Sequence, residues 1–198
     1  MTSIAIATED VLTEVVCEKI AAYLGIEVSL RLRKGGSGYL KSKFDSFIQM
    51  SRRYPVLIVT DLDRKPCAPR LVEEWTQGRV LPEGLLLRVA VREVEAWLMA
   101  DRQAFGALVG ASIDFCAESV LDPKEKVLTL ASRAARDVRD DLVASKGALA
   151  SQGIGYNKRL CEFVLLNWCP MRASANSESL RRAMDRVRSV CCATNASG

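Results

Sequence analysis

The sequence predicts an α/β fold in which helices flank a parallel four-stranded sheet and further helices extend the C-terminus. Over the first hundred residues, short apolar runs alternate with segments whose apolar residues recur at helical spacing. The apolar runs are nearly uninterrupted, as in parallel strands that are buried on both faces. After about residue 102 only helical spacing remains. We therefore expect an α/β core at residues 1–101 and a helical region at residues 102–198 packed on that core.

The elements of the core follow from this alternation. The first helix is expected to begin near Thr8 or Asp10, either of which can cap it, and to end at Gly25, because glycine commonly follows a helix. A second helix is expected over residues 39–53, and a third within the segment that starts at Asp63. The expected strands are residues 3–8, 27–33, 55–61 and 85–91.

The C-terminal region is predicted to contain three helices. Asp122 followed by Pro123 is a typical helix start, and this helix is expected to run to about Val143. Residues 156–168 form the second expected helix, and the third begins near Asn176.

Charge is unevenly distributed along the chain. Residues 1–120 carry 15 Lys and Arg against 16 Asp and Glu, whereas residues 121–198 carry 13 against 8. A basic second part suits a polyanionic partner, although a solvated, arginine-rich helix surface explains the charge equally well.

The amino-acid composition excludes several kinds of catalytic and metal-binding site. The 198 residues include no histidine, which excludes Ser-His and Cys-His catalysis and a histidine general base. The seven cysteines form no CxxC pair, so no zinc site is indicated, and free thiols suit a cytoplasmic protein. We expect no membrane span, because no apolar run reaches ~18 residues, and no signal peptide, because no basic segment precedes the first strand.

Carboxylates follow three of the expected strands. Glu9 follows the first, Asp61 and Asp63 follow the third, and Glu93 and Glu95 follow the fourth. Right-handed crossovers place the carboxyl ends of parallel strands on one edge, where α/β sheets bind ligands, so these acids are expected to converge. Two aspartates one residue apart repel each other unless a cation lies between them. The sequence therefore predicts a divalent-metal site, with a helix cap and a solvated aspartate as the alternative.

Five strings of the sequence carry a resemblance to a known family. They are Ala7-Thr8-Glu9-Asp10, Val59-Thr60-Asp61-Leu62-Asp63, Arg92-Glu93-Val94-Glu95-Ala96-Trp97-Leu98-Met99-Ala100-Asp101, Asp122-Pro123-Lys124 and Gly155-Tyr156-Asn157-Lys158. Together they resemble the Toprim (topoisomerase-primase) superfamily, and within it a bacterial family of stand-alone Toprim-like proteins whose active site is similar to that of OLD (overcoming-lysogenisation-defect) nucleases. The resemblance spans most of the chain and implies a Rossmann-like Toprim fold. Topoisomerase and primase activity are not expected, because the additional domains of those enzymes do not fit in this short chain.

The resemblance assigns roles to the acidic residues. Glu9 matches the Toprim glutamate, a general acid/base, and Asp61 and Asp63 match the acidic pair that binds magnesium. Glu95 is expected as a third metal ligand rather than Glu93, because the matching string centres on it. Since only oxygen ligands are on offer, Mg²⁺ or Mn²⁺ is expected rather than zinc.

The matching strings contain three further residues whose roles can be considered. Lys124 and Lys158 are expected to stabilise the negative charge of the transition state, with solvated lysines as the alternative. Asp101 is expected only to end its helix.

These expectations together indicate a metal-dependent nuclease that cleaves phosphodiester bonds of DNA or RNA. Several nuclease relatives serve in anti-phage defence, so the resemblance also implies a protein partner from a defence system, and an oligomer is compatible with it. One alternative is a catalytically silent or partner-regulated Toprim module that acts as a sensor or toxin subunit. Another is a DxD phosphatase or phosphotransferase, although such enzymes usually carry the motif on the first strand rather than the third.

Overall fold

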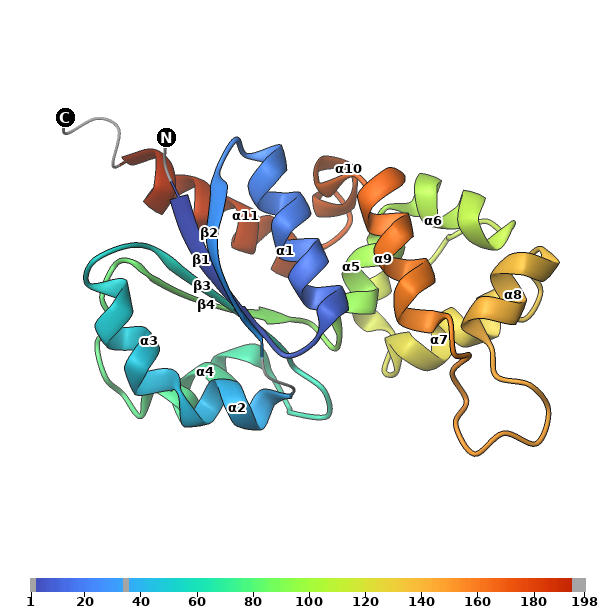
Figure 1. Cartoon of the computed structure of the whole chain (residues 1–198), viewed down its shortest axis with the longest axis horizontal. Helices are drawn as coiled ribbons and strands as arrows, with labels where there is room; N and C mark the ends of the chain where they lie inside the picture. The colour runs from blue at the N-terminus through green and yellow to red at the C-terminus, as the bar shows by residue number, and fades with distance from the viewer. Residues whose placement is uncertain (1–2, 34–35, 194–198) are drawn as a thin grey trace. The chain divides into compact units, whose positions relative to one another are not determined.

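The computed structural model describes residues 3–33 and 36–193 (Figure 1). The chain divides into two compact units, of which the first comprises Met1–Val91 with Ser179–Gly198 and the second comprises Arg92–Glu178. The boundary after residue 101 that the sequence suggested stays a prediction.

The first unit is built on a parallel sheet. Within the described residues the sheet has four strands in the order β2-β1-β3-β4, and every neighbouring pair is parallel. This arrangement confirms the predicted α/β fold class. The strands are β1 (Ser3–Thr8), β2 (Glu27–Arg33), β3 (Val56–Asp61) and β4 (Leu85–Ala90).

Helices cover both faces of this sheet (Figure 1). Alternate strand residues such as Ala7 and Ile58 pack with α2, α3 and α4 in one apolar core that includes Phe44 and Trp75. The other face is covered by α1 and by α11 (Figure 1). Helix α11 is tied to the sheet by two hydrogen bonds, from the Val91 N–H to Ser179 Oγ at 3.4 Å and from Arg186 Nη2 to the Glu83 carbonyl at 3.2 Å. The helices are α1 (Val11–Tyr23), α2 (Ser37–Ser42), α3 (Phe44–Ser51), α4 (Ala68–Thr76) and α11 (Glu178–Ala193).

The sequence predicts a single helix over residues 39–53. This prediction is wrong in one respect, because the structure has two helices there. Helix α2 ends at Ser42, and Lys43, with φ of −102° and ψ of 5°, separates it from α3. The break leaves Leu40 of α2 and Phe44 of α3 both buried in the same core. Packing against the sheet therefore overrides the continuous periodicity of this segment.

The second unit consists of helices. Asp122 caps α7 as predicted, since its Oδ1 accepts a hydrogen bond of 2.9 Å from the Glu125 N–H. The helix expected to continue to Val143 instead stops at Ala131 and restarts as α8 at Arg136. The elements are α5 (Val94–Ala100), α6 (Arg102–Val109), a 3₁₀ turn (Ala117–Ser119), α7 (Pro123–Ala131), α8 (Arg136–Leu142), α9 (Tyr156–Leu166) and α10 (Pro170–Ser174).

Aromatic residues form the core of the second unit. Trp97 is fully buried, and its carbonyl accepts a hydrogen bond of 3.1 Å from the indole Nε1 of Trp168. Phe105 and Phe163 make an edge-to-face contact with ring centroids 5.7 Å apart. Trp97 is thus a packing residue. Among the helices that the structure describes, none is long and apolar enough to cross a bilayer.

Candidate active site

The ends of β1 and β3 bring Glu9 and Asp61 together. These strands are parallel neighbours in which Thr8 pairs with Val59, so the residue after β1 meets the last residues of β3. Oε1 of Glu9 accepts a hydrogen bond of 3.2 Å from the Asp61 N–H and another from the Thr60 hydroxyl. The expected approach of Glu9 to the Asp61 strand end is therefore present in the first unit.

The environment of Glu9 raises the pKa of its carboxyl above the ordinary value. Burial raises the pKa of the Glu9 carboxyl, and the hydrogen bonds from Thr60 and Asp61 lower it only in part. The negative charges of Asp63 and Asp10 raise it further, so the net change is upward. Asp10 itself caps α1 by accepting a 2.8 Å hydrogen bond from the Thr13 N–H, which leaves Glu9 as the carboxyl turned toward β3.

Asp61 and Asp63 occupy different backbone environments. Asp61 is the last residue of β3 and pairs with Ala90, while the next residue, Leu62, donates its N–H to the Ala90 carbonyl at 2.9 Å. The buried Leu62 anchors a tight turn, which the Lys65 N–H closes on the Leu62 carbonyl at 3.0 Å. Within this turn Asp63 is exposed and has a φ of 51°, in the left-handed region. The turn therefore displays Asp63 directly after the strand that carries Asp61.

The other two predicted acids, Glu93 and Glu95, lie in the second unit. Glu95 is only 3% exposed, and Tyr156 donates its hydroxyl to Glu95 Oε1 at 3.0 Å. Lys124 Nζ lies 3.8 Å from the same oxygen, and the Lys124 N–H donates to Glu93 Oε2 at 2.9 Å. The structure thus brings together Glu93, which precedes α5, Glu95 of α5 and Lys124 of α7.

The environment of Glu95 raises the pKa of its carboxyl toward neutral pH. Burial raises the pKa of Glu95 to about 6, against the lowering effect of Lys124 and the hydrogen bond from Tyr156, while the nearby Glu93 raises it. The sequence alone assigns no role to Tyr156. A sequence feature does point to this residue, because Tyr156 belongs to the Gly-Tyr-Asn-Lys string that contributes to the family resemblance.

Lys158 lies apart from Glu95 on the surface of α9. Its side chain is 82% exposed, and its Nζ is 3.9 Å from Glu162 one turn further along the helix. Lys158 and Tyr156 are two positions apart, so they point to different sides of the helix. The roles of Lys158 and Lys124 as stabilising cations, and of Glu95 and Glu93 as metal ligands, stay predictions.

The donor set of the first unit fits a hard divalent cation. Asp61, Asp63 and Glu9 offer carboxylate oxygens, and Mg²⁺ binds proteins through one or two carboxylates while keeping several waters. In the described part of the chain, no group of three or more His, Cys, Asp or Glu residues is arranged to hold a metal ion. The pair Asp61 and Asp63 is nonetheless sufficient in number for Mg²⁺ or Mn²⁺, which these residues would hold with water completing the coordination.

The fold and the side chains define a class of site, in which an α/β domain carries acids at the carboxyl edge of a parallel sheet. Among solved structures, the chain is similar to the C-terminal region of the Burkholderia pseudomallei OLD protein, with a TM-score of 0.47 and 14% sequence identity over 96% of this chain and 99% of that chain. No family model matches the sequence, and no curated protein matches it.

Proposed function

We propose that this protein is a nuclease that depends on Mg²⁺ or Mn²⁺ and cleaves phosphodiester bonds of DNA or RNA. The observation that carries the proposal is the contact between Glu9 and the backbone of Asp61. It joins two strand ends that are 52 positions apart in the sequence, at the edge where α/β sheets bind ligands. We therefore take Glu9, Asp61 and Asp63 as the acidic residues of the proposed site.

Each residue has a separate task in the proposed reaction. Asp61 and Asp63 would hold the cation, which would offset the charge of the scissile phosphate and lower the pKa of a water molecule. Glu9 accepts a proton from that water, because the hydrogen bonds from Thr60 and Asp61 hold its carboxyl group at the same edge. The water oxygen bonds to phosphorus, the bond from phosphorus to the leaving oxygen breaks, and that oxygen takes up a proton from solvent.

The test is cleavage of single- and double-stranded DNA and of RNA by the purified chain with Mg²⁺ or Mn²⁺. Asp61→Asn with Asp63→Asn should abolish metal-dependent cleavage, and Glu9→Gln should slow it by about 10²–10⁴-fold, as expected for loss of a general base. Asp45→Asn is the matched control, because Asp45 is an exposed carboxylate of the same unit that pairs with Arg79. Cleavage that is equally fast in the double variant would disprove the proposal.

A catalytically silent module that works with a partner is the second candidate. In the second unit, Leu149, Ile154 and Leu166 are exposed apolar side chains that a partner would cover if they belong to its binding surface. Calorimetry with Mn²⁺ separates the two candidates: metal binding that is lost in the double variant, without cleavage of any nucleic acid, would favour the silent module. Hydrolysis of a simple phosphomonoester without nuclease activity would instead indicate a DxD phosphatase.

A further inference from the structure

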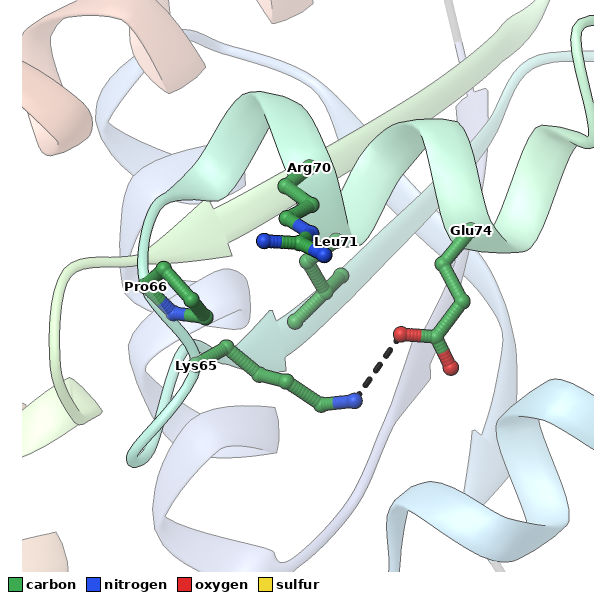
Figure 2. Close-up of a pocket in the computed structure, with 5 residues that line it drawn as sticks. All are labelled: Lys65, Pro66, Arg70, Leu71 and Glu74. Atoms are coloured by element: carbon green, nitrogen blue, oxygen red, sulfur yellow. Dashed lines mark hydrogen bonds and ion pairs between the residues drawn. The ribbon is translucent and has the colours of Figure 1, made fainter.

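A pocket of about 320 Å³ lies directly beyond the turn that carries Asp63. It is lined by Lys65 and Pro66 from the end of that turn and by Arg70, Leu71 and Glu74 from α4 (Figure 2). Leu71 is buried and contributes an apolar wall, while the other side chains bring charge to the opening. The volume is in the range of sites that accept a small ligand or one unit of a polymer.

Positive charge predominates around this pocket. Lys65 Nζ lies 2.8 Å from Glu74 Oε2, and Lys41 of α2 lies 2.7 Å from Glu74 Oε1. The guanidinium of Arg70 is drawn over Leu71 (Figure 2), and no carboxylate among the described residues pairs with it. Lys41, Lys65 and Arg70 thus supply three positive charges against the one negative charge of Glu74, so these four side chains together carry a net positive charge at neutral pH.

Glu74 behaves as an internal anion in this group. The hydrogen bonds from Lys41 and Lys65 lower the pKa of Glu74 to about 2, so its carboxylate stays charged at any physiological pH. Two lysines that converge on one carboxylate present the donors that a phosphate oxygen would use. An incoming phosphate would have Arg70 available at once and would compete with Glu74 for the two lysines.

The position of the pocket relates it to the acidic pair. Lys65 follows Asp63 by two residues, so the two backbone positions are at most ~7 Å apart. A strand whose scissile phosphate lies at Asp61 and Asp63 would therefore place a neighbouring phosphate within reach of Lys65 and Arg70. The apolar wall formed by Leu71 and Pro66 suits the sugar or base attached to that phosphate.

We propose that the pocket formed by Lys65, Arg70 and Glu74 binds a backbone phosphate of the nucleic-acid strand, next to the scissile phosphate. Arg70 and Lys65 contact this phosphate, and Glu74 is the internal carboxylate that the phosphate displaces. The assignment rests on the proposed nuclease function for its ligand, since it names a substrate subsite beside the same acids.

The test measures binding of labelled DNA and RNA oligonucleotides by fluorescence anisotropy over a series of salt concentrations, without added metal. Arg70→Gln should weaken binding about tenfold, as for loss of one charged hydrogen bond, and should reduce the slope of log affinity against log salt by about 1. Glu74→Gln should strengthen binding, because it removes the competing carboxylate. Arg53→Gln is the control, since Arg53 is an exposed arginine of the same unit and lies outside the pocket.

These outcomes test the phosphate subsite separately from the proposed nuclease function. Binding by Arg70→Gln that equals binding by Arg53→Gln, or weaker binding by Glu74→Gln than by the unchanged protein, would overturn it. Inorganic phosphate could instead stabilise the protein against unfolding only when Arg70 is present, while no oligonucleotide binds. That result would also overturn the inference, in favour of a small phosphate ligand. Because no cleavage is needed, a protein that fails to cleave but shows both variant effects would support the subsite and reject the nuclease.

Discussion

Arg172 donates hydrogen bonds of 2.9 and 2.8 Å from its Nε and Nη2 to the two carboxylate oxygens of Asp101. Asp101 is fully buried, and it also accepts hydrogen bonds from the Cys169 N–H at 2.8 Å and the Ala104 N–H at 3.3 Å. One carboxylate therefore caps α6 and fixes the segment that leads into α10. From the sequence, Asp101 was expected only to end a helix.

Asp101→Asn should destabilise the second unit strongly. The substitution keeps the size of the side chain but removes the charge that compensates Arg172, and breaking a buried ion pair costs about 3–5 kcal/mol. The lower end is expected here, because the Arg172 side chain is 41% exposed. Urea unfolding of the purified variant measures the loss. In Asp185→Asn, which removes an exposed partner of Arg181, the loss should stay below about 1 kcal/mol; equal stability of the two variants would contradict the prediction.

Arg88→Met should leave the protein as stable as before or make it more stable, by up to about 1–3 kcal/mol. The Nε of Arg88 is buried and has no hydrogen-bond partner among the described residues. Burial, and then the charge of Arg186, lower the pKa of Arg88, which shows that its cation is held unfavourably. Methionine keeps an unbranched apolar chain without this cost.

Thermal and urea unfolding test the Arg88 substitution. Arg186→Met is the informative comparison, because it removes a hydrogen bond to the Glu83 carbonyl as well as a charge, and it should be less favourable. A clear loss of stability in Arg88→Met would show that the guanidinium is satisfied in solution.

Tyr156→Phe should raise the pKa of Glu95 above its value of about 6. Burial is the main cause of the raised pKa, and the Tyr156 hydroxyl is one of the groups that oppose it. An acid whose pKa is raised on folding is protonated more readily in the folded state. Its contribution to stability is therefore present below pH 4.5 and lost as the pH rises through about 6. In Tyr156→Phe this loss should extend to higher pH.

The pH dependence of unfolding, together with carboxyl-carbon NMR of Glu95, checks this shift. Glu95→Gln serves as the reference in which this titration is absent. A carboxyl that titrates at the same pH in Tyr156→Phe as in the unchanged protein would show that the hydrogen bond has no influence on it.

The Glu74 carboxyl should titrate near pH 2 and return toward its ordinary pKa of 4.5 in Lys41→Gln or Lys65→Gln. The hydrogen bonds from these lysines, Lys41 first, cause the lowering. An acid whose pKa is lowered on folding stabilises the folded state above its unfolded pKa, and this contribution is lost as the pH falls toward 2. Since the group is exposed, salt should screen the effect. Carboxyl-carbon NMR at low and high salt measures it, and a pKa of Glu74 that neither lysine changes would contradict the prediction.

The strands and the meeting of Glu9 with Asp61 were predictable from the sequence for a physical reason. Uninterrupted apolar runs define the strand bounds, and the right-handed crossover rule fixes which ends share an edge. The break at Lys43 was not predictable in the same way, because the segment contains no glycine or proline there and its apolar spacing continues across the break. Periodicity identifies the face that a segment buries, but not a change in its direction.

The contact between Glu95 and Tyr156 lay outside what spacing can predict. The two residues are 61 positions apart and belong to different helices, α5 and α9. Their meeting depends on how those helices pack, which the large buried residues Trp97 and Trp168 help to determine through their own hydrogen bond. The charged pocket at Lys65 and Glu74 likewise depends on how α4 is placed after the turn.

The left-handed backbone of Asp63 limits natural variation at this position in two independent ways. Outside glycine, only asparagine and aspartate adopt such a φ with ease, so most substitutions would distort the turn before they altered its chemistry. Of the three tolerated residues, only aspartate brings a negative charge. Homologous sequences that have asparagine or glycine at this position would preserve the shape of the turn without its negative charge.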